Sequence, residues 1–220
     1  MNTIFGGRNL RKYVSRHIPK PLKFLISKTR RIARIILGLP VPPPDVYKQL
    51  VLKQYQEKYQ YSCLIETGTY LGEMVAAQKS NFKKIYSIEL GRHLYQSAAE
   101  KFKDDLHISI IHGDSGNVLP SLMQHIEEPS IFWLDGHYSG GITAKGEKEC
   151  PIFEELSAIF NSKKLSHVIL IDDARCFDGR GDYPNIDTLI GYIKENRPDY
   201  QVTVESDIIR CVELTGSIQS

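Results

Sequence analysis

The sequence has few cysteines, and their spacing supports neither a zinc site nor a disulfide framework. Among 220 residues there are four, and no two of them form a C-x-x-C pair: Cys63, Cys150, Cys176 and Cys211. Structural zinc sites and small disulfide-bonded folds both depend on closely spaced cysteines. We therefore expect reduced thiols in the core or in loops, and a cytoplasmic protein.

Long apolar runs are also absent. A helix that spans a bilayer needs about 20 consecutive apolar residues, and no stretch of this sequence reaches that length. Charged residues interrupt the apolar stretches, so no signal-peptide pattern is evident either. The chain has no internal repeats, and its length suffices for one domain with an appendage.

Acidic residues are missing from the first 44 positions. Residues 1–44 contain ten lysines and arginines, which leaves 18 of the 28 basic side chains against all 26 acidic ones in the rest of the chain. Between residues 22 and 37 the pattern is that of a basic amphipathic helix. We expect residues 1–37 to pack on the domain itself or on a second copy of the chain, with a peripheral contact to an anionic membrane as the alternative. Few aromatic residues accompany the charges, so a nucleic acid is not a favoured partner.

A proline-rich stretch, Pro40–Pro44, separates this basic arm from the remainder. Such a stretch is a stiff spacer and a natural domain boundary. Asp45 follows as the expected N-cap of a helix that continues to about Tyr59. The sequence therefore predicts a helical arm and linker at 1–44 and a folded domain at 45–220.

Strands alternate with helices through most of that domain. The apolar runs predict five strands, at Ser62–Glu66, Lys84–Glu89, His107–His112, Ser130–Asp135 and His167–Asp172. Helical runs separate them near residues 72–80, 92–103, 116–126 and 150–161. Two further runs, Gln201–Glu205 and Ile208–Leu214, flank a short polar turn. The pattern predicts an α/β fold with a doubly wound, mostly parallel sheet, closed at one edge by an antiparallel hairpin.

The most informative stretch is Cys63–Gly72. A short apolar run ends in Glu66, and a turn with two glycines follows. In open α/β sheets, ligands bind just past the carboxyl ends of such strands. The turn is not the dinucleotide fingerprint G-x-G-x-x-G, because Tyr70 stands at the second glycine, and it lacks the Gly-Lys-Ser/Thr of a P-loop. By itself the stretch is equally typical of an ordinary β-to-α turn.

An acid ends or closely follows every predicted parallel strand. Glu89 comes about 20 residues after the first turn, where an acid typically binds ribose hydroxyls. Asp114 and Ser115 follow the third strand, where they either hold an adenine amino group or cap the next helix. These positions predict a nucleoside-containing ligand.

The remaining strand-end acids are Asp135, Asp172 and Asp173. If the fourth and fifth strands are neighbours, they lie about 4.8 Å apart and their terminal carboxylates converge. Clustered carboxylates repel one another unless a cation neutralises them. Oxygen ligands suit Mg²⁺ or another hard divalent cation, so we expect a metal site here, with loop capping by these aspartates as the alternative.

His137 follows closely, in the segment Asp-Gly-His-Tyr-Ser-Gly-Gly. Imidazole titrates near neutrality and is the commonest general base in enzymes. The glycines allow the loop to bend around a substrate. We predict His137 as a catalytic base, and an exposed loop histidine is the alternative.

Taken together, residues 46–214 resemble the class I S-adenosylmethionine-dependent methyltransferases. The segment Glu66-x-Gly68-x-x-x-Gly72 is similar to the acidic, glycine-rich first motif of that family, with Tyr70 in place of the usual middle glycine. The resemblance implies a Rossmann-like sheet and S-adenosyl-L-methionine as the cofactor. The cofactor-binding residues that it implies are Glu66, Thr67, Gly68, Tyr70, Gly72, Glu89, Asp114, Ser115 and Asp135.

Within the class, Asp135 with Asp172-Asp173 resembles the metal-dependent macrocin O-methyltransferase-like group, which modifies sugar hydroxyls. That resemblance implies a metal held by Asp135, Asp172 and Asp173, which lowers the pKa of an acceptor hydroxyl. Asp135 and His137 are then the catalytic residues. That group has an acid at the position of His137. The segments 138–145 and 175–183 are expected to shape a pocket for a small-molecule or saccharide acceptor and to act as lids.

Two other functions compete with this one. A nucleotide-dependent oxidoreductase is built on a similar sheet, although the missing second glycine counts against it. Alternatively, the chain is a non-catalytic scaffold that docks through its basic arm. Acids at every strand end argue against a scaffold with a vestigial site.

Overall fold

The computed structural model describes residues 42–136, 149–162 and 164–214. Apart from Pro42, these residues belong to one compact unit. Within the described ranges, no helix is both long and apolar enough to cross a membrane. The predicted arm at 1–37, His137 and the loop at 138–145 lie outside the described residues.

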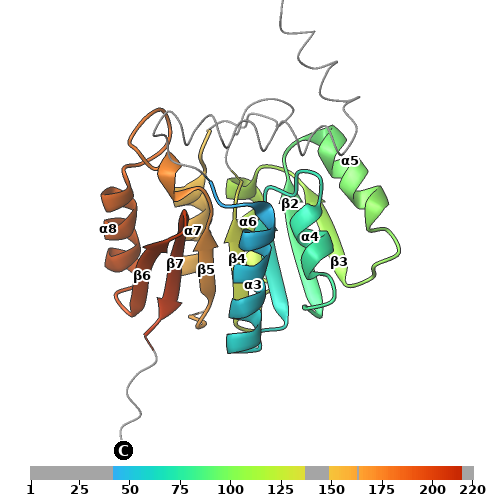
Figure 1. Ribbon diagram of the computed structural model, residues 1–220, viewed down its shortest axis with the longest axis horizontal. Coiled ribbons are helices and arrows are strands. Elements are labelled where there is room, and N and C mark those ends of the chain that lie inside the picture. The colour runs from blue at the N-terminus through green and yellow to red at the C-terminus, as the bar shows by residue number, and fades with distance from the viewer. Residues whose placement is uncertain (1–41, 137–148, 163, 215–220) are drawn as a thin grey trace, which may run out of the picture. The chain divides into compact units, whose positions relative to one another are not determined.

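A seven-stranded sheet forms the centre of this unit (Figure 1). Its spatial order is β3-β2-β1-β4-β5-β7-β6. The strands are β1 (Cys63–Thr67), β2 (Lys84–Glu89), β3 (Ile108–His112), β4 (Ser130–Leu134), β5 (Val168–Ile171), β6 (Tyr200–Glu205) and β7 (Ile208–Glu213). Strands β1 to β5 run parallel, and β7 pairs antiparallel with both β5 and β6. The predicted α/β fold with a C-terminal hairpin is confirmed.

In the described residues, six α-helices and one 3-10 helix accompany these strands, and all but the first lie between strands. They are α3 (Asp45–Tyr59), α4 (Glu73–Gln78), α5 (Arg92–Lys101), α6 (Ser115–Met123), α7 (Ile152–Phe160), η1 (Ala174–Cys176) and α8 (Ile186–Asn196). The hydrophobic residues of α6, α7 and α8 belong to the core on one face of the sheet, and those of α3 and α4 belong to the core on the other.

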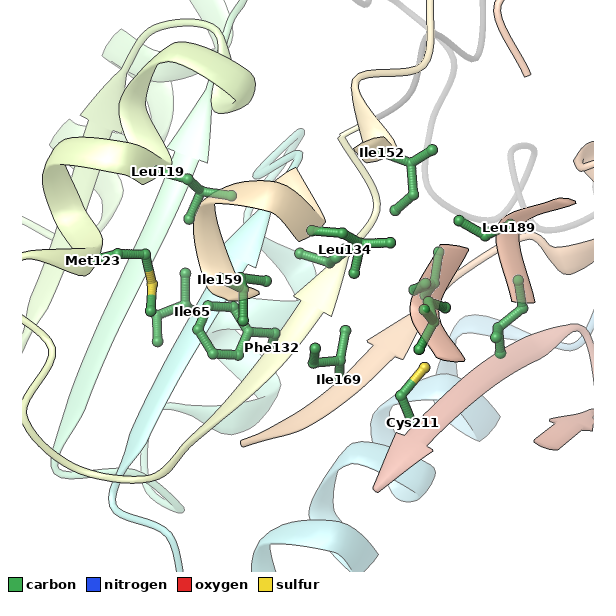
Figure 2. Packing of buried hydrophobic residues seen from close by; sticks show 14 of the residues in the cluster. Ile65, Leu119, Met123, Phe132, Leu134, Ile152, Ile159, Ile169, Leu189 and Cys211 are labelled. Atoms are coloured by element: carbon green, nitrogen blue, oxygen red, sulfur yellow. The ribbon is translucent and has the colours of Figure 1, made fainter. Parts of the chain in front are cut away.

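Strand β4 shows how one apolar run supplies both cores. Phe132 and Leu134 pack toward α6 and α7, as Figure 2 shows, whereas Ile131 and Trp133 pack in the core that α3 and α4 cover. Successive side chains of a strand point to opposite faces, so a strand buried on both faces needs an unbroken apolar run. Because of this requirement, the central strands could be predicted from the sequence. Both ends of each predicted strand lie within one residue of the observed ends.

Two local features differ from the sequence-based expectations. Asp45 is the first residue of α3 and not its N-cap. The N-cap is Pro44, which has an extended backbone conformation and makes no side-chain cap hydrogen bond. Helix α8 was not predicted, although Asn185 caps it by accepting a hydrogen bond from the backbone N–H of Asp187 at 2.8 Å. Its signal was weak, since β-branched residues and a glycine lower helix propensity.

A candidate active site at the carboxyl edge of the sheet

The turn between β1 and α4 is built against the end of β4. Gly68 has φ +84°, and a Cβ atom placed on it would lie 2.3 Å from the backbone oxygen of Asp135. No other residue type fits there without a backbone shift. Tyr70, which replaces a glycine of the usual motif, also has a left-handed conformation, with φ 50°. At Gly68, the turn therefore places backbone, and not a side chain, against the end of β4.

Glu89 holds this turn in place from the end of β2. Its Oε2 accepts a hydrogen bond from the N–H of Tyr70 at 2.8 Å, and its Oε1 accepts one from the N–H of Gly91 at 2.7 Å. Burial raises the pKa of Glu89, and the two backbone hydrogen bonds oppose that rise. Each carboxylate oxygen has capacity for a further hydrogen bond. Glu89 is thus a carboxylate that the backbone holds at the carboxyl end of β2, and its role toward a ligand stays a prediction.

Glu66 lies beneath the same turn. Only 2% of it is exposed, and its carboxylate accepts a hydrogen bond from the hydroxyl of Ser87, which lies 2.6 Å from Thr69 Oγ1. Burial raises the pKa of Glu66 to about 8, and the charges of Asp135 and Glu89 act in the same direction. At neutral pH this group is therefore largely protonated.

Asp114 and Ser115 have separate roles at the start of α6. The carboxylate of Asp114 caps the helix by accepting a hydrogen bond from the N–H of Gly116 at 3.0 Å, which was one of the two predicted alternatives. Ser115 Oγ donates to Glu155 Oε1 of α7 at 2.5 Å. A Cβ atom placed on Gly136 would lie 2.8 Å from Glu155 Oε1 and 3.0 Å from Thr67 Oγ1. These polar groups therefore surround the backbone that follows β4.

Glu155 is a site residue that sequence reasoning missed. Its side chain is buried beside Ser115 and Gly136. An acid in the first turn of a helix is ordinarily explained by the helix dipole, so nothing local singled it out. Its contact with Ser115 spans 40 positions of the chain and required the packing of α7 on α6.

The ends of β4 and β5 lie side by side, which was the condition for the predicted convergence of their acids. Leu134 pairs with Ile171, and the N–H of Asp172 donates to the carbonyl of Leu134 at 3.0 Å. Asp135 follows β4, where its own N–H donates to the carbonyl of Thr67 at 3.1 Å. Asp135 and Asp172 thus start from adjacent strand ends.

The cation beside Asp172 and Asp173 comes from the protein itself. The amine of Lys48 in α3 donates to Asp172 Oδ2, and also to Asp173 Oδ1 at 3.1 Å. Burial lowers the pKa of Lys48, but the charges of Asp172 and Asp173, with a smaller effect of Asp135, raise it above its ordinary value. Lys48 therefore stays an ammonium ion.

A second cation extends the cluster. Arg175 Nη1 donates to Asp173 Oδ1 at 2.8 Å and also to the carboxylate of Asp207, in the turn between β6 and β7. Burial lowers the pKa of Arg175, whereas its contacts with Asp173 and Asp207 raise it. The remaining oxygen of Asp172 accepts the N–H of Asp173 at 2.7 Å.

The predicted metal ligands, Asp135, Asp172 and Asp173, do not fit a metal ion in this arrangement. In the part of the chain that the structure describes, no group of three histidine, cysteine, aspartate or glutamate side chains is placed to hold one. Lys48 lies against two of the three carboxylates and supplies the charge that a metal was expected to bring. The prediction considered strand-end acids alone and took no account of a lysine from α3.

The segment 175–183, predicted as a lid, is anchored at several points. Phe177 is buried in the core, its carbonyl accepts the N–H of Ile186 at 3.0 Å, and its ring packs on that of Tyr183. The carboxylate of Asp182 accepts the N–H of Glu149 at 2.8 Å. The role of this segment toward an acceptor stays a prediction.

The four cysteines are free, as predicted. Burial raises the pKa of the Cys63 thiol to about 11 and those of Cys150 and Cys211 to about 12. Thiols in this state are poor nucleophiles and poor metal ligands. They add no chemistry to the candidate site.

Neither a protein-family model nor a curated protein sequence matches the chain. Among solved structures, it is similar to the O-methyltransferase TomG from Streptomyces achromogenes, involved in tomaymycin synthesis and determined with SAM. The identity is 17% and the TM-score 0.57, over 86% of this chain and 89% of that one. The SAH-bound methyltransferase PaMTH1 of Podospora anserina has 16% identity and a TM-score of 0.56, over 97% of this chain and 100% of that one.

An O-methyltransferase from Bacillus cereus, in complex with SAH, has 15% identity and a TM-score of 0.55, over 93% of this chain and 97% of that one. At such identities the likeness establishes the fold alone, which is the Rossmann-like fold that these structures share.

Proposed function

We propose that this protein is an S-adenosylmethionine-dependent O-methyltransferase whose acceptor is a hydroxyl group of a polar small molecule or a saccharide. The observation that carries the proposal is the carboxylate of Glu89, which two backbone N–H groups hold at the end of β2. An acid at this position of a Rossmann-like sheet binds ribose hydroxyls. The similar structures from S. achromogenes, P. anserina and B. cereus contain SAM or SAH.

The residues at the ends of β1 to β4 fit an adenosyl ligand. Glu89 keeps acceptor capacity for ribose hydroxyls, and Gly68, which has no side chain, lets the turn pack closely on the backbone of Asp135. Asp114 and Ser115 lie at the start of α6, on the adenine side. We assign the same cofactor site to Glu66, Thr67, Tyr70 and Gly72, which form the turn or support it from below.

When bound, the cofactor supplies an electrophilic methyl carbon on a sulfonium ion. Asp135 places a carboxylate at the end of β4, where negative charge stabilises a nearby cation. We assign the proton of the acceptor hydroxyl to an imidazole nitrogen of His137, two residues further on. No step is assigned to a divalent metal, because Lys48 and Arg175 already pair with two of the three carboxylates that were expected to bind it.

Calorimetric titration with S-adenosylhomocysteine tests the proposed cofactor. We expect a dissociation constant in the micromolar range for the wild-type protein. Glu89→Gln should weaken binding by at least about tenfold, because hydrogen bonds to a charged group contribute about 1.5–3 kcal/mol. The matched control is Glu100→Gln, an exposed residue of α5 that pairs with Lys103, and it should bind like the wild type.

No binding to a protein that is folded by circular dichroism would remove the methyltransferase proposal. Binding of a nicotinamide dinucleotide instead would favour the oxidoreductase, and binding of neither would favour a scaffold. If binding is found, methyl transfer to sugars and other polar hydroxyl compounds is the next assay, with His137→Ala as the test of the proposed base.

For residues 1–37, the predictions remain packing on the domain itself or on a second copy of the chain, with contact to an anionic membrane surface as the alternative. Deletion of this arm should then alter either the oligomeric state or co-sedimentation with anionic vesicles. If both are unchanged, neither contact is the role of the arm, and packing on its own domain is the alternative that is left.

A further inference from the structure

We propose that Lys48 is a built-in cation, which takes the position between Asp172 and Asp173 that a divalent metal ion was expected to occupy. The chain itself then provides the positive charge at the end of β5. For methyl transfer this inference rests on the proposed function, and it implies a reaction that a chelator does not inhibit.

Lys48 is held in place by the residues around it. The hydroxyl of Tyr47 donates to Ser206 in the turn between β6 and β7 at 3.0 Å, and the carbonyl of Gln49 accepts from the side chain of Gln78 at 2.8 Å. One turn further on, Val51 and Leu52 are buried in the core. The start of α3 is therefore anchored on both sides of Lys48, and its amine is directed to one place.

The environment of Lys48 differs from that of an ordinary surface lysine. Its side chain is 12% exposed, whereas Lys53, five residues later on the same helix, is 48% exposed and pairs with Glu57 at 3.6 Å. Surface pairs of the second kind contribute little to structure. Lys53 is thus a matched control in the same helix.

All three predicted metal ligands act on Lys48. Its amine contacts Asp172 and Asp173 directly, and the charge of Asp135 also reaches it. Both oxygens of Asp172 are occupied, one by Lys48 and the other by the N–H of Asp173. A metal ion at this carboxylate would therefore meet the positive charge of the ammonium group that Asp172 already binds.

An ammonium group is a suitable replacement for a hard cation. It is compact, carries one positive charge and donates up to three hydrogen bonds, so oxygen ligands satisfy it as they satisfy Mg²⁺. Without the charge of Lys48, the carboxylates of Asp172 and Asp173 should repel each other unless another cation neutralises them. The structure therefore predicts that a neutral side chain at position 48 frees Asp172 and Asp173, as a pair of oxygen ligands, to bind a divalent cation.

Titration of the full-length protein with Mn²⁺ tests this inference. The variants are Lys48→Met, which removes the charge, Lys48→Arg, which retains it, and Lys53→Met as the control. We expect Lys48→Met to bind one Mn²⁺ at least about tenfold more tightly than the wild type. The arginine and control variants should behave like the wild type. Adding Asp172→Asn to Lys48→Met should remove the gained site.

Two results would overturn the proposal. The first is a folded Lys48→Met variant that binds Mn²⁺ no better than the wild type. The second is tight binding of Mn²⁺ to the wild type that Asp172→Asn abolishes. This measurement does not use Lys48→Met, so it tests the proposal even if that variant does not fold. Neither result depends on methyl transfer, so failure of the proposed function, seen as absent binding of S-adenosylhomocysteine, is a separate outcome.

Discussion

Two halves of the same sheet edge satisfy their carboxylates in different ways. At the end of β2, Glu89 accepts hydrogen bonds from the backbone N–H groups of Tyr70 and Gly91. At the end of β5, Asp172 and Asp173 accept hydrogen bonds from the side chain of Lys48. Backbone donors leave the carboxylate its negative charge, whereas an ammonium donor neutralises it.

This difference matters for the ligand that each half can take. A carboxylate that keeps its charge and part of its acceptor capacity suits neutral donors such as hydroxyl groups. Carboxylates that are already paired with lysine and arginine present a structured, partly neutralised surface. Under the proposed function, this difference favours the nucleoside at the β1–β2 half and the acceptor near the β4–β5 half.

The largest effect is expected when the charge of Lys48 is removed. Lys48→Met should lower the free energy of unfolding by about 4 kcal/mol in the absence of metal, because it leaves the buried Asp172 without its partner. Urea denaturation measures the change. Lys53→Met should change stability by less than about 0.5 kcal/mol. If Lys48→Met and Lys53→Met both lowered the free energy of unfolding by a similar small amount, the pairing of Lys48 with Asp172 would not distinguish this half of the sheet edge.

Gly68 joins the two halves, so its substitution should disturb both. Gly68→Ala should destabilise the protein by about 3 kcal/mol, because the new Cβ atom meets the backbone of Asp135 and φ is +84°. Gly191→Ala is the matched control. Its position in α8 has open space for a Cβ atom, so it should instead gain about 0.5–1 kcal/mol. A neutral result for Gly68→Ala in thermal denaturation would mean that the turn moves away from β4 at little cost.

Glu66 should make stability depend on pH. Its pKa is about 8 in the folded protein, above the ordinary 4.5, so the stability from its protonated form is complete below about pH 4.5 and is lost as the pH rises through about 8. Glu66→Gln cannot lose a proton. Relative to that variant, the wild type should lose about 2 kcal/mol between about pH 5.5 and pH 7.5. Parallel urea-denaturation curves for the two proteins at both pH values would contradict the raised pKa.

The smallest effect is expected at the contact between α6 and α7. Ser115→Ala removes the 2.5 Å hydrogen bond to the buried Glu155 and should cost about 1 kcal/mol. It should also weaken S-adenosylhomocysteine binding less than Glu89→Gln does, since we place it on the adenine side. The exposed Ser109 of β3 provides the control Ser109→Ala. Equal binding losses for Ser115→Ala and Glu89→Gln would revise the roles of the two positions.

Sequence alone determined the strands, their parallel arrangement and the row of acids at one edge. These features are local, because a strand buried on both faces requires an unbroken apolar run and its end follows in the next residue or two. The tight turn at Gly68, the cap at Asp114 and the hairpin likewise follow from short segments. Helix α8 is also a local element, but the helix propensity of its sequence was too low for it to be predicted.

Only the tertiary structure decided which groups those acids meet. The contact of Lys48 with Asp172 spans 124 positions, and that of Ser115 with Glu155 spans 40. Helix α3 contains three lysines, and the sequence does not indicate which of them is exposed to water and which lies between two carboxylates. Burial makes the difference, because charges removed from water must find partners, and the packing of α3 on the sheet brings this partner to the end of β5.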